Sequence, residues 1–128
     1  MQLSKKIKFI DENETDLLER LIDFLKIQSI STDKRFSEDC KNAANWLVRE
    51  LKFVGFEAKA HKTAGHPIVL ASAGAGHPHL LFYGHYDVQP TDPREEWKHD
   101  PFEPTIESGP NGNQVIARGA SDDKGQLM

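Results

Sequence analysis

The sequence predicts a layered α/β domain, and three observations support this prediction. Two segments, residues 15–28 and 37–54, carry apolar residues at helical spacing. Beyond the second segment the apolar period changes to two, which is typical of strands. The order is therefore helix, helix and then strands, without an internal repeat or linker that would indicate a second domain.

The two helices are defined by their apolar stripes. In the first helix the stripe consists of Leu17, Leu18, Leu21, Ile22 and Leu25, with charged residues between them. In the second helix it consists of Cys40, Ala43, Ala44, Leu47, Leu51 and Val54. We expect Ser37 to cap the start of the second helix and Gly55 to end it. Trp46 lies beside the second stripe, and we expect it in the core.

Four strand regions follow the helices. Residues 56–60 alternate between apolar and charged types, which predicts a half-buried strand, and residues 68–71 form a short apolar run. The most apolar stretch, residues 79–84, predicts a central strand buried on both faces. Residues 105–107 and 114–117 flank a turn rich in glycine and asparagine, which predicts a hairpin.

The composition excludes several classes of function. With 38% hydrophobic and 28% charged residues, the 128-residue chain has the balance of an ordinary soluble domain. The net charge of −4 provides no basic footprint for nucleic acid, and no segment approaches the roughly 20 apolar residues of a membrane span. The single cysteine, Cys40, is expected to be buried and favours a reducing compartment. We therefore expect a cytoplasmic protein that binds neither nucleic acid nor membrane.

A candidate metal ligand comes directly after the predicted central strand. His85 stands where α/β sheets bind ligands, beyond the carboxyl end of a strand, and one of its ring nitrogens can bind a metal. Asp87 lies two residues further on and therefore points to the same side of an extended segment. It can either support the other ring nitrogen of His85 or lie close behind the metal. By itself, the His-x-Asp pattern is a weak signal.

A pair of acids, Asp122 and Asp123, follows a second turn. One carboxylate can bridge two cations about 3.5–4 Å apart. The alternative is a helix N-terminus, with Ser121 as the cap and both acids facing the helix dipole, and the two interpretations are compatible. Four further histidines have no carboxylate at a useful spacing and are interpreted as loop or surface residues: His61, His66, His77 and His79. His99 is adjacent to Asp100, but Pro101 follows, so a turn is the better explanation.

Three segments in order resemble the M20 metallopeptidases, especially the dipeptidase branch with the carnosinases. They are residues 84–90, then Trp97 with residues 100–102, then residues 117–126. The resemblance implies a zinc-peptidase-like α/β catalytic domain with helices packed on a mixed sheet. Its other implications concern the site. His85 is a ligand of one zinc, Asp122 bridges two zincs, Asp87 is the catalytic-site acid that orients His85, and the Asp122–Asp123 peptide is cis.

The implied activity is metal-dependent hydrolysis of amide bonds in dipeptides or N-acyl amino acids. Two zinc ions polarise the scissile carbonyl and activate a water molecule, and manganese or cobalt can replace zinc. The full-length form is expected to be a homodimer. Ala117 stands where the family often has glycine, a small departure from the pattern.

The resemblance also implies an incomplete catalytic domain. Residues 1–128 correspond to its N-terminal portion, and the general-base glutamate, the remaining metal ligands and the lid or dimerisation domain are expected beyond Met128. Two protein ligands fall short of the three of a catalytic zinc site, so we expect these 128 residues alone to be inactive. The alternative is a non-catalytic binding or regulatory fragment that pairs with a full-length relative.

Overall fold

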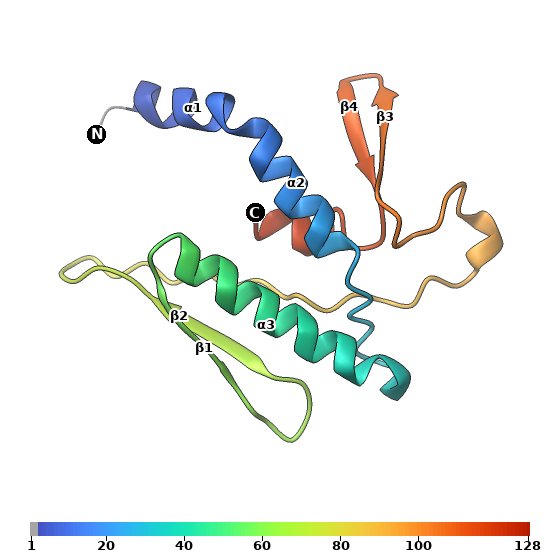
Figure 1. Ribbon diagram of the computed structural model, residues 1–128, viewed down its shortest axis with the longest axis horizontal. Helices are drawn as coiled ribbons and strands as arrows, with labels where there is room; N and C mark the ends of the chain where they lie inside the picture. Colours follow the sequence, from blue (N-terminus) through green and yellow to red (C-terminus); the bar gives the residue numbers. More distant parts are fainter. Residues whose placement is uncertain (1–2) are drawn as a thin grey trace.

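The computed structural model describes residues 3–128 and has three α-helices and two β-hairpins within that range (Figure 1). The helices and strands are α1 (Leu3–Glu12), α2 (Glu14–Leu25), α3 (Ser37–Phe53), β1 (Glu57–His61), β2 (Ile68–Ser72), β3 (Thr105–Gly109) and β4 (Gly112–Ile116). Three single-turn 3₁₀ helices join them: η1 (Lys34–Phe36), η2 (Arg94–Glu96) and η3 (Lys124–Gln126). Within the described residues, no helix combines the length and the apolarity needed to cross a membrane.

Both predicted helices are present, with differences at their ends. Helix α2 ends at Leu25, and α3 ends at Phe53, where Gly55 adopts a positive φ of 96° as expected of a helix-terminating glycine. Ser37 is not the N-cap of α3. It is the first helical residue. Its hydroxyl donates to the Lys34 carbonyl (2.8 Å), which belongs to the 3₁₀ turn η1 that directly precedes α3.

Helix α1 was not predicted from the sequence. Half of its ten residues are charged, and none of its side chains is buried. Leu3, Ile7 and Ile10 recur at helical spacing, but they stay at least half exposed, and this short stripe was not used to predict a helix.

The core lies between α2 and α3. Phe24 is fully buried and stacks flat on Trp46, with ring centroids 4.4 Å apart and an interplanar angle of 3°. Ala43 completes the cluster, and Cys40 is fully buried beside it on α3. The predicted core positions of Cys40 and Trp46 are therefore confirmed.

The strands form two separate antiparallel pairs. In the first pair β1 runs against β2, from Glu57 opposite Ser72 to His61 opposite Ile68, and α3 packs against both strands. The second pair, β3 and β4, is the predicted hairpin and projects away from the helices (Figure 1). The α/β class is confirmed, but the described residues form two small antiparallel sheets instead of one mixed sheet.

The predicted central strand at residues 79–84 is not a strand in the structure. Leu81 is 96% exposed and Tyr83 is 90% exposed, and no segment among residues 3–128 pairs with this stretch. A strand exists only through hydrogen bonds to neighbouring strands, so an apolar run without a partner has no ladder to join. The correction concerns the pairing and burial of this segment, and its apolar composition still indicates a preference for burial.

This exposed apolar run should make the 128-residue chain self-associate as its concentration rises. Large contiguous apolar patches with unpaired backbone groups are association sites. Replacing Leu81 and Phe82 together by lysine should reduce the larger species seen in sedimentation velocity. As a control, Leu3 and Phe9 are replaced by lysine in the same way. They are 72% and 62% exposed, but the backbone of their helix is already hydrogen-bonded, so the amount of larger species should not change. A wild-type chain that stays monodisperse at high concentration would contradict the prediction.

Candidate metal centre

The segment that carries His85 is fastened to the loop after α2. The hydroxyl of Ser29 donates to the carbonyl of Tyr86 (2.7 Å), and the Val88 amide donates to the carbonyl of Ser29 (2.9 Å). The Tyr86 ring packs against the Phe24 cluster, and its hydroxyl donates to the carbonyl of Pro67 (2.6 Å). These contacts come from three separate parts of the chain and hold the backbone at His85 in place.

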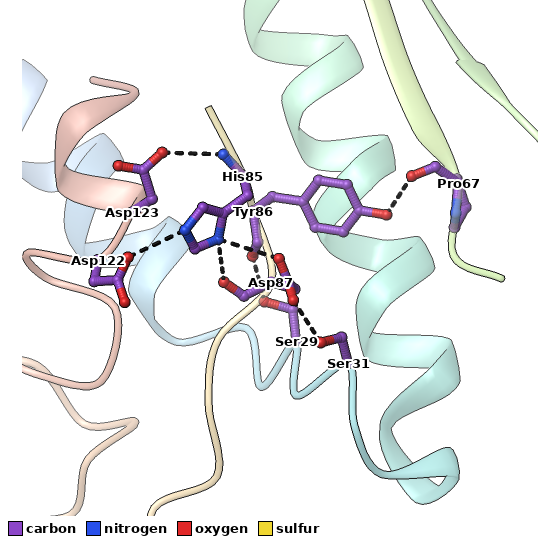
Figure 2. Close-up of polar contacts among 8 residues, drawn as sticks. All are labelled: Ser29, Ser31, Pro67, His85, Tyr86, Asp87, Asp122 and Asp123. Carbon is purple, nitrogen blue, oxygen red and sulfur yellow. Dashed lines mark hydrogen bonds and ion pairs between the residues drawn. The ribbon is translucent and has the colours of Figure 1, made fainter. Parts of the chain in front are cut away.

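The His85 ring lies between two carboxylates (Figure 2). Its Nδ1 atom is 3.1 Å from Oδ1 of Asp87 and 3.1 Å from the Asp87 carbonyl oxygen. Its Nε2 atom is 3.1 Å from Oδ1 of Asp122. The structure therefore brings together all three residues that the sequence singled out. Of the two roles left open for Asp87, it favours support of Nδ1, since Asp87 lies on the side of the ring opposite Asp122.

Asp87 is itself held by a residue that the sequence analysis did not identify. The hydroxyl of Ser31 donates to Oδ2 of Asp87, while Oδ1 faces His85. A polar chain thus runs from Ser31 through Asp87 and His85 to Asp122 (Figure 2). A carboxylate anchored at one oxygen can orient an imidazole with the other, which is the usual arrangement behind a metal-binding histidine.

The loop that carries Asp122 is closely packed against the His85 segment. Oδ2 of Asp123 accepts a hydrogen bond from the His85 backbone amide (3.0 Å), and the Asp122–Asp123 peptide is cis, as the resemblance implied. Gly119 has a positive φ of 84°, and a Cβ atom there would lie 2.7 Å from Val88. A Cβ on Gly84 would lie 2.2 Å from Leu127. The positive φ favours glycine at residue 119, and a larger residue at either position would have to displace the Val88 or Leu127 side chain.

Among the described residues, the acid pair does not stand at the N-terminus of an α-helix capped by Ser121. The element that follows is η3, a single 3₁₀ turn that begins at Lys124. Asp123 precedes it without a side-chain capping hydrogen bond, and Ser121 is exposed. The two acids face His85, so their position is explained by that contact.

Burial and hydrogen bonding shift the pKa values around the site. Partial burial alone lowers the pKa of His85, but the Asp87 carbonyl and the carboxylates of Asp122 and Asp87 outweigh it, so the pKa is raised. Burial raises the pKa of Tyr86 to about 12. Burial also lowers the pKa of Lys124 to about 7. The carboxylates that raise the pKa of His85 would favour a cation on Nε2 in the same way, whether a proton or a metal.

The donor set fits a divalent metal. An imidazole nitrogen and a carboxylate oxygen, each about 2.0–2.2 Å from a tetrahedral zinc, would lie roughly 3.3 Å apart. The observed separation between Nε2 of His85 and Oδ1 of Asp122 is 3.1 Å. The Asp122 side chain is 81% exposed and accessible to further ligands. Within residues 3–128, no group of three or more histidine, cysteine, aspartate or glutamate side chains converges on one point.

The comparisons with known proteins agree with this geometry. The profile described as Peptidase family M20/M25/M40 matches residues 81–128, the part of the chain that contains His85, Asp87 and Asp122. The Cys-Gly metallodipeptidase of Schizosaccharomyces pombe is 30% identical over 140 residues, which cover 100% of this chain and 29% of that protein. The corresponding protein of Candida albicans is 34% identical over 134 residues, which cover 93% of this chain and 27% of that protein.

Solved structures give the same result. Human carnosine dipeptidase 1 superimposes with a TM-score of 0.84 at 26% identity, over 98% of this chain and 28% of that one. The di-peptidase Dug1p from Saccharomyces cerevisiae superimposes with a TM-score of 0.78 at 26% identity, over 92% of this chain and 27% of that one. The chain belongs to peptidase family M20. It spans slightly more than a quarter of the length of the relatives it matches.

Other members of the family carry different names. Succinyl-diaminopimelate desuccinylase of Thiobacillus denitrificans is 32% identical over 110 residues, which cover 86% of this M20 chain and 26% of that protein. The family resemblance therefore includes both dipeptidases and a deacylase.

The remaining histidines of the M20 chain lie outside the His85–Asp122 pair. His61, His77 and His79 are exposed, as predicted. His66 is half-buried, with its Nε2 atom 2.8 Å from the Ser31 carbonyl, and His99 is half-buried, with its Nε2 atom 2.6 Å from Glu107. Both residues lie outside helices and strands, as predicted, but neither is fully exposed, and each ring has a specific polar partner.

Cys40 of this M20 chain should make stability depend on pH above 9. Burial and, to a lesser extent, the negative charge of Asp87 raise the pKa of the thiol from 9.0 to about 11. Between these values the unfolded chain loses the proton and the folded chain keeps it, so the free energy of unfolding should fall as the pH rises. We expect a loss of about 1 kcal/mol by pH 10 from this group.

Urea unfolding at pH 8 and pH 10 measures this effect, and Cys40→Ala is the comparison. Alanine keeps a small apolar side chain in the core but has no thiol to ionise. The wild-type chain should lose more stability between the two pH values than Cys40→Ala. Equal losses in the two proteins would show that the thiol does not control this dependence.

Proposed function

We propose that the protein provides the His85–Asp122 part of a two-metal centre in an enzyme that hydrolyses amide bonds of dipeptides or N-acyl amino acids. The observation that supports this most directly is the pairing of His85 Nε2 with Asp122 at 3.1 Å, with Nδ1 backed by Asp87. Zinc is the metal we favour, with manganese or cobalt as possible replacements, because imidazole and carboxylate ligands suit all three.

Each of the three residues has a distinct part in this proposal. His85 presents Nε2 to one metal ion, and Asp87 accepts a hydrogen bond from Nδ1–H and thereby fixes the tautomer of the ring. The exposed carboxylate of Asp122 has two oxygens with which to bridge two ions. The bound metals would supply Lewis acidity toward the scissile carbonyl and toward the attacking water.

The substrate class follows from the relatives. The dipeptidases named above act on Cys-Gly and on carnosine by name, and the desuccinylases are named for removing a succinyl group. We therefore assign dipeptides first and N-acyl amino acids second. A cytoplasmic location and a homodimeric full-length form belong to the same proposal, and the 128 residues alone are expected to be inactive because a catalytic zinc has three or more protein ligands.

The test uses the natural protein isolated from its source cells. Its intact mass is measured first, and hydrolysis of Cys-Gly, carnosine and an N-succinyl amino acid is then followed before and after chelation. Hydrolysis that stops on chelation and returns with zinc, manganese or cobalt would support the proposal. A metal-loaded protein of several times 14.4 kDa that cleaves none of these substrates would contradict it.

A second candidate is a non-catalytic fragment that pairs with a full-length relative. The exposed apolar residues 80–83 favour it, because an unpaired apolar stretch can add to the sheet of another chain. This candidate predicts a natural mass near 14.4 kDa and a full-length M20 protein that co-purifies with the chain. A 14.4 kDa protein that purifies alone would exclude it.

A further inference from the structure

The two proposed ligands are held by their sequence neighbours, since neither ligand lies in regular structure. His85 and Asp122 stand on irregular segments 37 residues apart in the sequence. Beside His85, Tyr86 packs against the Phe24 cluster. Two residues after Asp122, Lys124 enters the same region of the core. The separation of the ligands therefore depends on what holds these two neighbours.

Lys124 is an unusual residue to find at such a place. Its side chain is fully buried, although lysine is almost never fully buried unless its amino group has partners. Here Nζ donates to the carbonyl oxygen of Phe24 in the last turn of α2 (3.0 Å) and to that of Ile27, two residues after the helix ends (2.7 Å). Nζ also lies 4.8 Å from the centre of the Phe24 ring.

These partners leave the lysine little freedom. The Phe24 and Ile27 carbonyls each also accept a backbone amide, from Ile27 (3.3 Å) and Ser29 (2.9 Å), and both lie near the negative end of the α2 dipole. An amino group moved away from them inside the core would lose its hydrogen bonds and incur the cost of burial without compensation. The loop is fastened on both sides of Lys124, because Asp123 accepts from the His85 amide (3.0 Å) and Leu127 packs on the Phe24 cluster.

We propose that Lys124 is a positioning residue for the metal centre. By tying the loop to the end of α2, it holds Asp122 at the distance from Nε2 of His85 at which both can bind one metal ion. The positioning role rests on the proposed function, because it presupposes a metal centre. The hydrogen bonds from Lys124 to the Phe24 and Ile27 carbonyls are present without metal. A lysine that only stabilised the fold would leave metal affinity unchanged in any variant that still folds.

The test compares three variants of the 128-residue chain. Lys124→Met keeps a long side chain against Phe24 but cannot donate a hydrogen bond. Lys124→Gln keeps one donor and serves as the second variant where methionine prevents folding. Lys26→Met is the matched control, because Lys26 lies at the same end of α2 but is exposed, with its amino group 2.8 Å from Asp23.

The first measurement needs no metal. Hydrogen exchange of the His85 backbone amide, followed by NMR, reports whether Asp123 still accepts its hydrogen bond. We expect exchange to be at least roughly tenfold faster in Lys124→Met, with the core amides of α3 unchanged, and no change in Lys26→Met. Unchanged exchange at His85 in a folded Lys124 variant would overturn the proposal, whatever the metal results.

The second measurement is the affinity for Co²⁺. It is obtained from the change in visible absorption on titration and from the change in the NMR signals of the His85 ring nitrogens. Loss of the tie should weaken binding roughly tenfold, at the lower end of the range for partners that orient ligands. Affinity within twofold of wild type in a folded Lys124→Met chain would overturn the positioning role. If Asp122→Asn binds Co²⁺ as well as the wild type, the proposed metal centre fails instead, and the exchange measurement still decides whether the tie exists.

Discussion

Replacing Asp122 by asparagine should remove the response of the His85 ring to zinc while the chain remains folded. The Asp122 side chain is 81% exposed and its only described polar partner is Nε2 of His85, so its loss costs the fold little. Asparagine has nearly the same shape but lacks the negative charge and the second oxygen needed to bridge two cations. Loss of a direct ligand should weaken binding by more than the roughly 10–100-fold that supporting residues contribute.

The measurement is a zinc titration followed by the ring ¹⁵N shifts of His85, which detects weak binding as well as strong. Asp23→Asn is the matched control, because Asp23 is a similarly exposed aspartate that pairs with Lys26 on α2. Asp87→Asn should weaken zinc binding by only the roughly 10–100-fold expected of a residue that orients a ligand, since Asp87 contacts Nδ1 of His85 and not Nε2. Equal zinc responses in the wild type and in Asp122→Asn would exclude Asp122 as a ligand.

The sequence predicted which polar residues lie close together better than it predicted the sheet. By spacing alone His85, Asp87 and Asp122 are a weak signal, and their roles are expected because three segments in order resemble the M20 family. The burial of residues 79–84 depends instead on which strands lie on either side, and a single segment carries no information about its neighbours. The segment is therefore apolar enough to predict a central strand, yet Leu81 is exposed and unpaired among the described residues.

Lys124 and Ser31 show a different limit. Both act through backbone or carboxylate partners far away in the sequence, since Lys124 reaches Phe24 and Ser31 reaches Asp87. A lone lysine or serine in a loop normally indicates a solvated surface position, and nothing in its immediate neighbours indicates burial. Only the folded chain shows that these two side chains hold the site in place.

Replacing Phe24 by alanine should have the largest effect on stability. Phe24 has no exposed surface, stacks on Trp46 at 4.4 Å, and lies under the Lys124 amino group. Changing a buried phenylalanine to alanine typically lowers the free energy of unfolding by about 3–5 kcal/mol. Buried apolar surface is lost, and the space that the ring filled is left as a cavity. Small domains have only about 5–15 kcal/mol in total, so the variant should lose much of its cooperative unfolding.

Urea unfolding followed by far-ultraviolet circular dichroism measures this loss, with Phe53→Ala as the control because Phe53 is 79% exposed. The control should change the free energy of unfolding by less than about 0.5 kcal/mol, as surface substitutions usually do.

Phe24→Leu should have a stability between those of the two variants, because leucine refills most of the cavity but cannot stack on Trp46. Since the Lys124 hydrogen bonds end at the Phe24 and Ile27 carbonyls, Phe24→Leu should also keep the His85 amide protected from exchange, provided α2 remains folded. If Phe24→Ala is about as stable as the wild type, packing between α2 and α3 does not determine the stability of the chain. Another set of contacts would then have to hold the segments that contain His85 and Asp122.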